Sequence, residues 1–102
     1  MIARVWRGWA TPAKADDYQR HYRTAVAEHL RSVPGFVEAR LLRTDDGGDV
    51  LFTSVVVFTD LESVHAFAGA EPRVAVVEEA ARAALVRWDE YVTHHDVAVD
   101  VA

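Results

Sequence analysis

The stretch Val50–Gly69, VLFTSVVVFTDLESVHAFAG, determines how the rest of the chain is arranged. Its first nine residues are almost all apolar and β-branched or aromatic, which indicates a strand buried on both faces. Alternation along a strand places Phe52, Val56 and Phe58 on one face, opposite Leu51, Val55 and Val57. Thr59–Glu62 then predicts a capping box at the start of a short helix, and Gly69 predicts its end. A strand that is apolar on both faces must be shielded from water on both faces, and a single layer of helices shields only one face of the sheet.

The rest of the chain continues this alternation of strand and helix patterns. In order, the segments are a strand at 2–9, a helix from Pro12 to Val33, a strand at 36–44, a turn at 45–49, the strand and helix above, a helical run from Pro72 to Leu85 and a strand at 88–99. This order predicts an α+β, ferredoxin-like split βαβ fold with a four-stranded antiparallel sheet. The first and third strands, apolar on both faces, belong at the centre. We expect helices on one sheet face and a second copy of the chain on the other, in a homodimer.

Composition limits the classes of function. A length of 102 residues fits one domain, 1–102, and 51% hydrophobic with 26% charged residues is ordinary for a folded protein. A net charge of −5 argues against nucleic-acid binding. The chain has no cysteine, which excludes disulfides, thiolate metal sites and a cysteine nucleophile. No signal-peptide core or membrane-length apolar run is present, so we expect no membrane association and a cytoplasmic location.

Motifs for metals and nucleotides are missing as well. The sequence has no HExxH, no histidine pair four residues apart and no acidic loop with calcium spacing, so no metal site is expected. Glycine-rich phosphate-binding motifs are absent, and no serine lies on a recognisable nucleophile turn. We therefore expect neither a metal nor a nucleotide cofactor.

Five segments carry a resemblance to a known family: MIARVWRGW, SVPGF, FTDLESVHAFAG, RVAVVEEAARAAL and WDEYVTHHDV. They span nearly the whole chain, which resembles the antibiotic biosynthesis monooxygenase (ABM) family of dimeric α/β-barrel proteins. The resemblance implies cofactor-independent oxygenation of an aromatic or phenolic substrate, in secondary metabolism or aromatic turnover. Such a substrate forms an electron-rich anion that reduces O₂ directly, in a pocket between sheet and helices. The protein supplies a base and donors to the oxyanion.

The haem-degrading branch of this family differs at its characteristic positions. Its strand-one asparagine, strand-three tryptophan and following histidine correspond here to Trp6, Phe58 and a residue near Glu71 or Arg73. The resemblance therefore does not imply haem degradation.

Two histidines are the catalytic candidates. His94 matches a histidine of the closing strand in this branch of the family, and alternation turns it away from His95. His65 lies on the short helix, at a pocket rim or in solvent. The alternative for His94 is a hydrogen-bonded structural histidine. His21 and His29 fall off the apolar stripe of the first helix and are expected in solvent.

The substrate-binding candidates are mostly aromatic: Trp6, Tyr18, Tyr22, Phe58 and Trp88, together with Arg4. Each aromatic residue has an alternative role in core or dimer packing. Arg4 shares a strand face with Trp6, and a buried arginine needs either a carboxylate partner or an anionic ligand. Asp89 or Glu90 is the expected partner, which makes Arg4 structural.

Three functions therefore stay open. The first is a cofactor-independent monooxygenase acting on an aromatic or polyketide-type molecule with O₂. The second is a non-oxidative cyclase or isomerase on the same scaffold. The third is a non-catalytic dimeric protein for small-ligand binding or stress response, whose cavity its own side chains would mostly fill.

Overall fold

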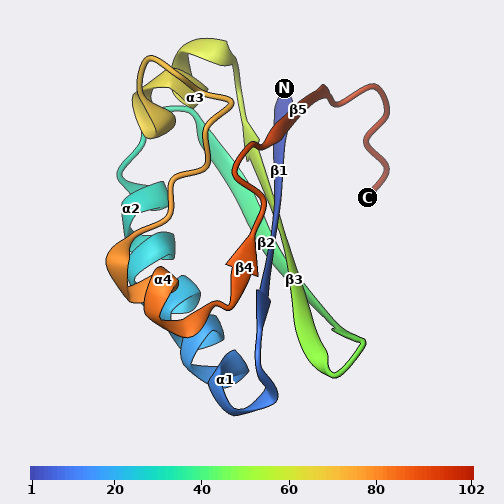
Figure 1. Cartoon of the computed structure of the whole chain (residues 1–102). Helices are drawn as coiled ribbons and strands as arrows, with labels where there is room; N and C mark the ends of the chain where they lie inside the picture. Colours follow the sequence, from blue (N-terminus) through green and yellow to red (C-terminus); the bar gives the residue numbers. More distant parts are fainter.

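The computed structural model describes residues 1–102 and confirms the expected α+β architecture, an antiparallel sheet with its helices on one face (Figure 1). The strands are β1 (Ile2–Ala10), β2 (Phe36–Asp46), β3 (Asp49–Phe58), β4 (Arg87–Trp88) and β5 (Thr93–Asp96). The helices are α1 (Pro12–His21), the π-helical η1 (Tyr22–Val26), α2 (Ala27–Arg31), α3 (Leu61–Ala68) and α4 (Glu79–Ala84). No helix is long and apolar enough to cross a membrane.

The sheet order is β2-β3-β1-β4, and β5 also pairs with β1. Both strands predicted to be central, β1 and β3, are central, because only they have apolar side chains on both faces. The register places Trp6 opposite Ser54, and it places Arg4 between Val56 on one side and His94 on the other. Side chains that are far apart in the sequence therefore share the helix-covered face.

The fourth strand and the helix before it differ from the prediction. Strand 88–99 is broken into β4 and β5, and only Glu79–Ala84 of the predicted helix 72–85 is helical. Pro72 and three valines within four residues disfavour a helix before that point. We call residues 70–78 the covering segment. It pairs with the chain between β4 and β5: Ala75 N–H donates to Glu90 O at 2.9 Å, and Val92 N–H donates to Arg73 O at 2.7 Å.

The short helix α3 begins and ends close to the predicted residues, but its cap is different. Asp60, not Thr59, is the N-cap, and its carboxylate accepts from Ser63 N–H at 2.9 Å, so the predicted capping box with Glu62 is wrong. Gly69 ends the helix with a φ of 84°. Gly35, with a φ of 87°, joins α2 to β2, and its carbonyl accepts from Thr59 N–H at 2.8 Å.

The second face of the sheet carries no helix (Figure 1). The strand registers place Val5, Leu42, Leu51, Val55 and Val57 on this face. Leu42 is 52% exposed. The helix-free face therefore carries apolar side chains, as the sequence pattern predicts, although Val57 is buried and the charged Arg7 shares this face.

Candidate functional site

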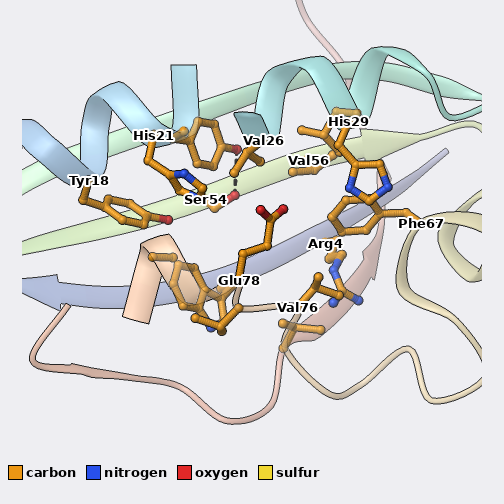
Figure 2. A pocket seen from close by; sticks show the side chains of 16 residues that line it. Arg4, Tyr18, His21, Val26, His29, Ser54, Val56, Phe67, Val76 and Glu78 are labelled. Carbon is orange, nitrogen blue, oxygen red and sulfur yellow. Dashed lines mark hydrogen bonds between the residues drawn. The ribbon is translucent and has the colours of Figure 1, made fainter. Parts of the chain in front are cut away.

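A cavity of about 60 Å³ lies between the helix-covered sheet face and α1, η1 and α2, and the covering segment closes its outer side (Figure 2). Most of the lining is hydrophobic. The lining residues are Arg4, Trp6, Tyr18, His21, Tyr22, Val26, His29, Leu30, Ser54, Val56, Phe67, Val76, Val77, Glu78, Ala81 and Val92. Few polar groups on an apolar wall are the usual composition of a small-molecule site.

Arg4 brings a buried charge to this cavity. The residue is 5% exposed, and its guanidinium donates to the carbonyl of Pro72 and, at 3.2 Å, to that of Val74. The ring of Phe67 lies 5.6 Å from the guanidinium carbon. Burial lowers the Arg4 pKa to about 10, and no carboxylate oxygen lies within 4.0 Å of it.

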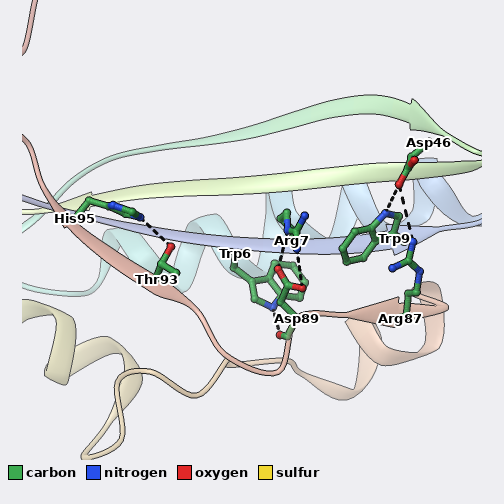
Figure 3. A network of polar contacts seen from close by, with 8 residues as sticks. All are labelled: Trp6, Arg7, Trp9, Asp46, Arg87, Asp89, Thr93 and His95. Carbon is green, nitrogen blue, oxygen red and sulfur yellow. Dashed lines mark hydrogen bonds and ion pairs between the residues drawn. The ribbon is translucent and has the colours of Figure 1, made fainter.

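The prediction that Asp89 or Glu90 is the carboxylate partner of Arg4 is wrong. Asp89 instead forms an ion pair with Arg7, at 2.8 Å between Oδ2 and Nε (Figure 3). Arg7 is three residues further along β1 and therefore points to the opposite face of the sheet. The positive charge of Arg4 thus lacks the counter-ion that a buried ion normally has.

Two buried hydroxyl groups lie on the cavity floor. Tyr22 Oη from η1 and Ser54 Oγ from β3 are 2.8 Å apart and hydrogen-bonded. Tyr18 also turns its ring into the cavity and packs on Phe52, with ring centroids 4.9 Å apart. Burial raises the pKa of both tyrosines, so both are neutral donors at physiological pH.

The structure brings His21 to the cavity, so the expectation that His21 lies in solvent is wrong. His29 is exposed, as expected, although it also borders the cavity. In a regular α-helix, eight residues would separate their directions by about 80°. The extra residue in the π turn of η1 reduces this offset to about 20°, so both face the sheet. His29 is exposed at the rim, with its ring 5.1 Å from that of Phe67. His21 Nε2 is buried and has no hydrogen-bond partner.

The two predicted catalytic histidines lie outside the cavity lining. His94 Nε2 is 3.1 Å from Arg4 Nη1, and because arginine can only donate, this nitrogen accepts. Burial and the charge of Arg4 lower the His94 pKa, which favours the neutral ring. His65 is exposed and contacts the carbonyl of Gly69 through Nδ1 at 3.0 Å. His95 points to the other sheet face, as predicted, and contacts Thr93 (Figure 3).

The aromatic candidates divide into two groups. Trp6, Tyr18 and Tyr22 line the cavity, and Trp6 Nε1 donates to Asp89 O at 2.7 Å (Figure 3). Phe58 is fully buried behind Phe67, in the core between α2 and β3. Trp88 packs against the other core cluster, with Arg82 over its ring. Phe58 and Trp88 therefore support the walls of the site but do not border its space.

A wider groove of about 390 Å³ lies between the same helix and β2. Its polar side chains, Gln19, Arg23 and Arg31, are partly or fully exposed. The smaller cavity holds the buried charge of Arg4, the free nitrogen of His21 and the hydroxyl pair, and it is therefore the stronger candidate. No group of three or more histidine, aspartate or glutamate side chains is placed to hold a metal ion.

Comparison with solved structures finds oxygenases and haem-degrading proteins of the same fold. SnoaB, a cofactor-independent oxygenase from Streptomyces nogalater, superposes with a TM-score of 0.69 at 20% identity, over 98% of this chain and 95% of that one. The ActVA-Orf6 monooxygenase of Streptomyces coelicolor, solved with nanaomycin D, gives 0.69 at 21% identity, over 99% and 90%. The haem degrader MhuD of Mycobacterium tuberculosis gives 0.61 at 19% identity, over 100% of both chains.

Identities this low establish the fold and leave the reaction open. No curated protein matches the sequence. The model of the antibiotic biosynthesis monooxygenase family matches residues 1–79, which include β1, the long helix, the hairpin, α3 and most of the cavity lining. The chain therefore belongs to the antibiotic biosynthesis monooxygenase family.

Proposed function

We propose that this protein is a cofactor-independent monooxygenase that acts on a small aromatic or phenolic molecule in the cavity beside Arg4. One observation carries the proposal: one apolar cavity holds an unpaired histidine nitrogen, neutral hydroxyl donors and an arginine without a counter-ion. These are a base and oxyanion donors, the groups that oxygenation through a substrate anion requires.

The reaction needs no electron source beyond the substrate. A base removes a proton from a phenolic or anthrone-type substrate, and the resulting anion transfers an electron to O₂. Recombination of the two radicals forms a carbon–oxygen bond in a peroxide, and loss of water then leaves a carbonyl. For a methylene carbon the balance is CH₂ + O₂ giving C=O + H₂O: the carbon loses four electrons and O₂ gains four.

The residues divide these roles by position. His21 is the best-placed base, because in the tautomer protonated on Nδ1 its Nε2 has a free lone pair. The Tyr22–Ser54 pair and Tyr18 are neutral donors for the developing oxyanion, and Trp6 supplies a flat apolar wall. His94 stays a predicted base, although its Nε2 already accepts from Arg4 and would have to leave that contact first.

The volume of the cavity constrains the substrate. About 60 Å³ is well below the roughly 300–1,000 Å³ typical of ligand pockets. An aromatic substrate must therefore displace the covering segment, whose Val76, Val77 and Glu78 border the space. The same small volume supports the third function, a non-catalytic dimeric protein for small-ligand binding or stress response, because the side chains of such a protein would mostly fill its cavity. The cyclase or isomerase alternative requires the same pocket without O₂.

We also propose that the chain acts as a homodimer through the helix-free face of the sheet. Apolar side chains on both central strands and exposed Leu42 on β2 support this interface. Burying such a face against its own copy is a common way to remove it from water.

Oxygen uptake by the purified, metal-free protein tests the proposal. Anthrones, naphthols and hydroquinones are supplied in turn, with uptake recorded against substrate alone and against protein alone. We expect uptake that needs both, and we expect His21→Gln to lower it at least tenfold. A compound that raises the melting temperature without oxygen uptake would instead support a cyclase, an isomerase or a binding protein.

A further inference from the structure

We propose that the ligand of this cavity is a monoanionic aromatic carboxylate, such as a hydroxybenzoate, whose carboxylate binds the guanidinium of Arg4. This inference rests on the proposed function only in placing the ligand in the same cavity. It adds the charge of the ligand and the residue that recognises it.

The first reason is the unbalanced charge of Arg4. A charge this deeply buried normally has an ion-pair partner, because removing it from water costs several kcal/mol. The structure gives Arg4 two carbonyl oxygens and a neutral histidine nitrogen, and none of these carries a negative charge. A carboxylate from outside the chain would supply the missing counter-ion.

The second reason is the number of free donors. A guanidinium has five N–H groups. Three contacts are made, to Pro72, His94 and Val74, so two N–H groups have no partner in the protein. Two donors from one planar guanidinium match the two oxygens of a carboxylate.

The third reason concerns the size of the charge. Glu78 also lines the cavity, and its carboxylate points from the covering segment into the space (Figure 2). This negative charge repels a dianion such as phosphate about twice as strongly as a monoanion, and the single buried arginine offsets only one negative charge. A ring with one carboxylate suits one guanidinium and the largely hydrophobic wall.

Arg4 also links ligand charge to access. Both carbonyl partners of the guanidinium, Pro72 and Val74, belong to the covering segment. A carboxylate on the two free N–H groups is a stronger acceptor than either carbonyl, and it draws the guanidinium toward the ligand. Its arrival therefore weakens the contacts that hold the segment over the cavity, and a neutral ligand of the same shape has no such effect.

Binding of acids and of their neutral amides provides the test. Titration calorimetry compares benzoate and salicylate with benzamide and salicylamide, which keep the ring and replace the charge. We expect each acid to bind at least tenfold more tightly than its amide, and Arg4→Met to remove this preference. The matched control is Arg7→Met, because Arg7 lies on the same strand but points to the opposite face. That variant should keep the preference.

Hydrogen exchange adds an independent readout. Amides of residues 70–78 should exchange faster with salicylate than with salicylamide. Equal binding of acids and amides, no binding of any of the four probes, or an acid preference that survives in Arg4→Met would each overturn the inference. If Arg4→Met does not fold, the comparison of acids and amides in the unmodified protein decides. Acid preference without oxygen uptake would remove the proposed function alone, and uptake without acid preference would remove this inference alone.

Discussion

Replacing Gly35 with alanine tests the junction that fixes α3, and with it Phe67, against the cavity. Gly35 has a φ of 87°, where an alanine costs about 1 kcal/mol more than glycine. A Cβ built there would lie 2.6 Å from Thr59 Oγ1 and 2.8 Å from Ser63 Cβ, and it would overlap Ser63 Oγ. Overpacking of this kind adds about 2 kcal/mol. Gly35→Ala should therefore lower the free energy of unfolding by about 3 kcal/mol, out of a typical total of about 5–15 kcal/mol.

The hairpin supplies the control. Gly48 has a φ of 95°, and a Cβ there would meet nothing within 4 Å. Gly48→Ala should therefore cost only the backbone share, about 1 kcal/mol. In thermal melts followed by circular dichroism, Gly35→Ala should lower the melting temperature by roughly 12–24 °C and Gly48→Ala by roughly 4–8 °C. If the two variants lose the same amount, the close approach of Gly35 to α3 does not limit stability and the reasoning fails.

Three further predictions concern the cavity and the bare sheet face. Tyr22→Phe leaves Ser54 without its 2.8 Å partner and should cost about 1 kcal/mol in urea unfolding, whereas Tyr91→Phe, on an exposed ring, should cost nothing measurable. The pKa of His94 is lowered below its ordinary 6.5 in the folded protein, so the stability present above pH 6.5 should be lost as the pH falls toward the pKa of the folded state. Thermal melts of His94→Asn should show a smaller loss of stability over this pH range. If the loss is the same in both proteins, His94 is not the source of the pH dependence. Light scattering at micromolar concentration should give twice the chain mass, and Leu42→Asp should give a monomer; a monomeric unmodified protein would contradict the proposed interface.

The strand pattern predicted the sheet well because its period is short and strict. The two-faced apolar character of β1 and β3 was enough to place them at the centre. It also placed Arg4 and Trp6 together and separated His94 from His95. These positions depend only on alternation, which the backbone of a strand enforces at every residue.

The helical parts of the site were harder to predict. His21 reaches the cavity through a π turn, and a stripe analysis that assumes a constant 3.6-residue period places it in solvent. The predicted helix from Pro72 to Leu85 includes the run of valines before α4, although β-branched residues at this density favour extended chain. The density of valines in residues 74–77 could therefore have indicated an extended segment. A π turn, in contrast, leaves no recognisable signal in a single sequence.

The carboxylate partner of Arg4 could not be chosen by sequence distance. Asp89 lies close to β1 but points toward Arg7, because it continues the pairing of β4 with β1: Trp88 faces Gly8, and Asp89 N–H donates to Arg7 O at 2.9 Å. The register between two strands is a long-range property, and it leaves no local pattern in the sequence.

The attachment of the covering segment has a consequence for how this scaffold can diversify. Backbone hydrogen bonds to Glu90 and Val92 hold it, and these bonds are indifferent to which side chains the segment carries. Val76 borders the cavity and is exposed, so exchanging it should alter the entrance at little cost in folding. Substitutions in the covering segment can thus change which ligands enter the cavity, while the sheet beneath the segment stays constant.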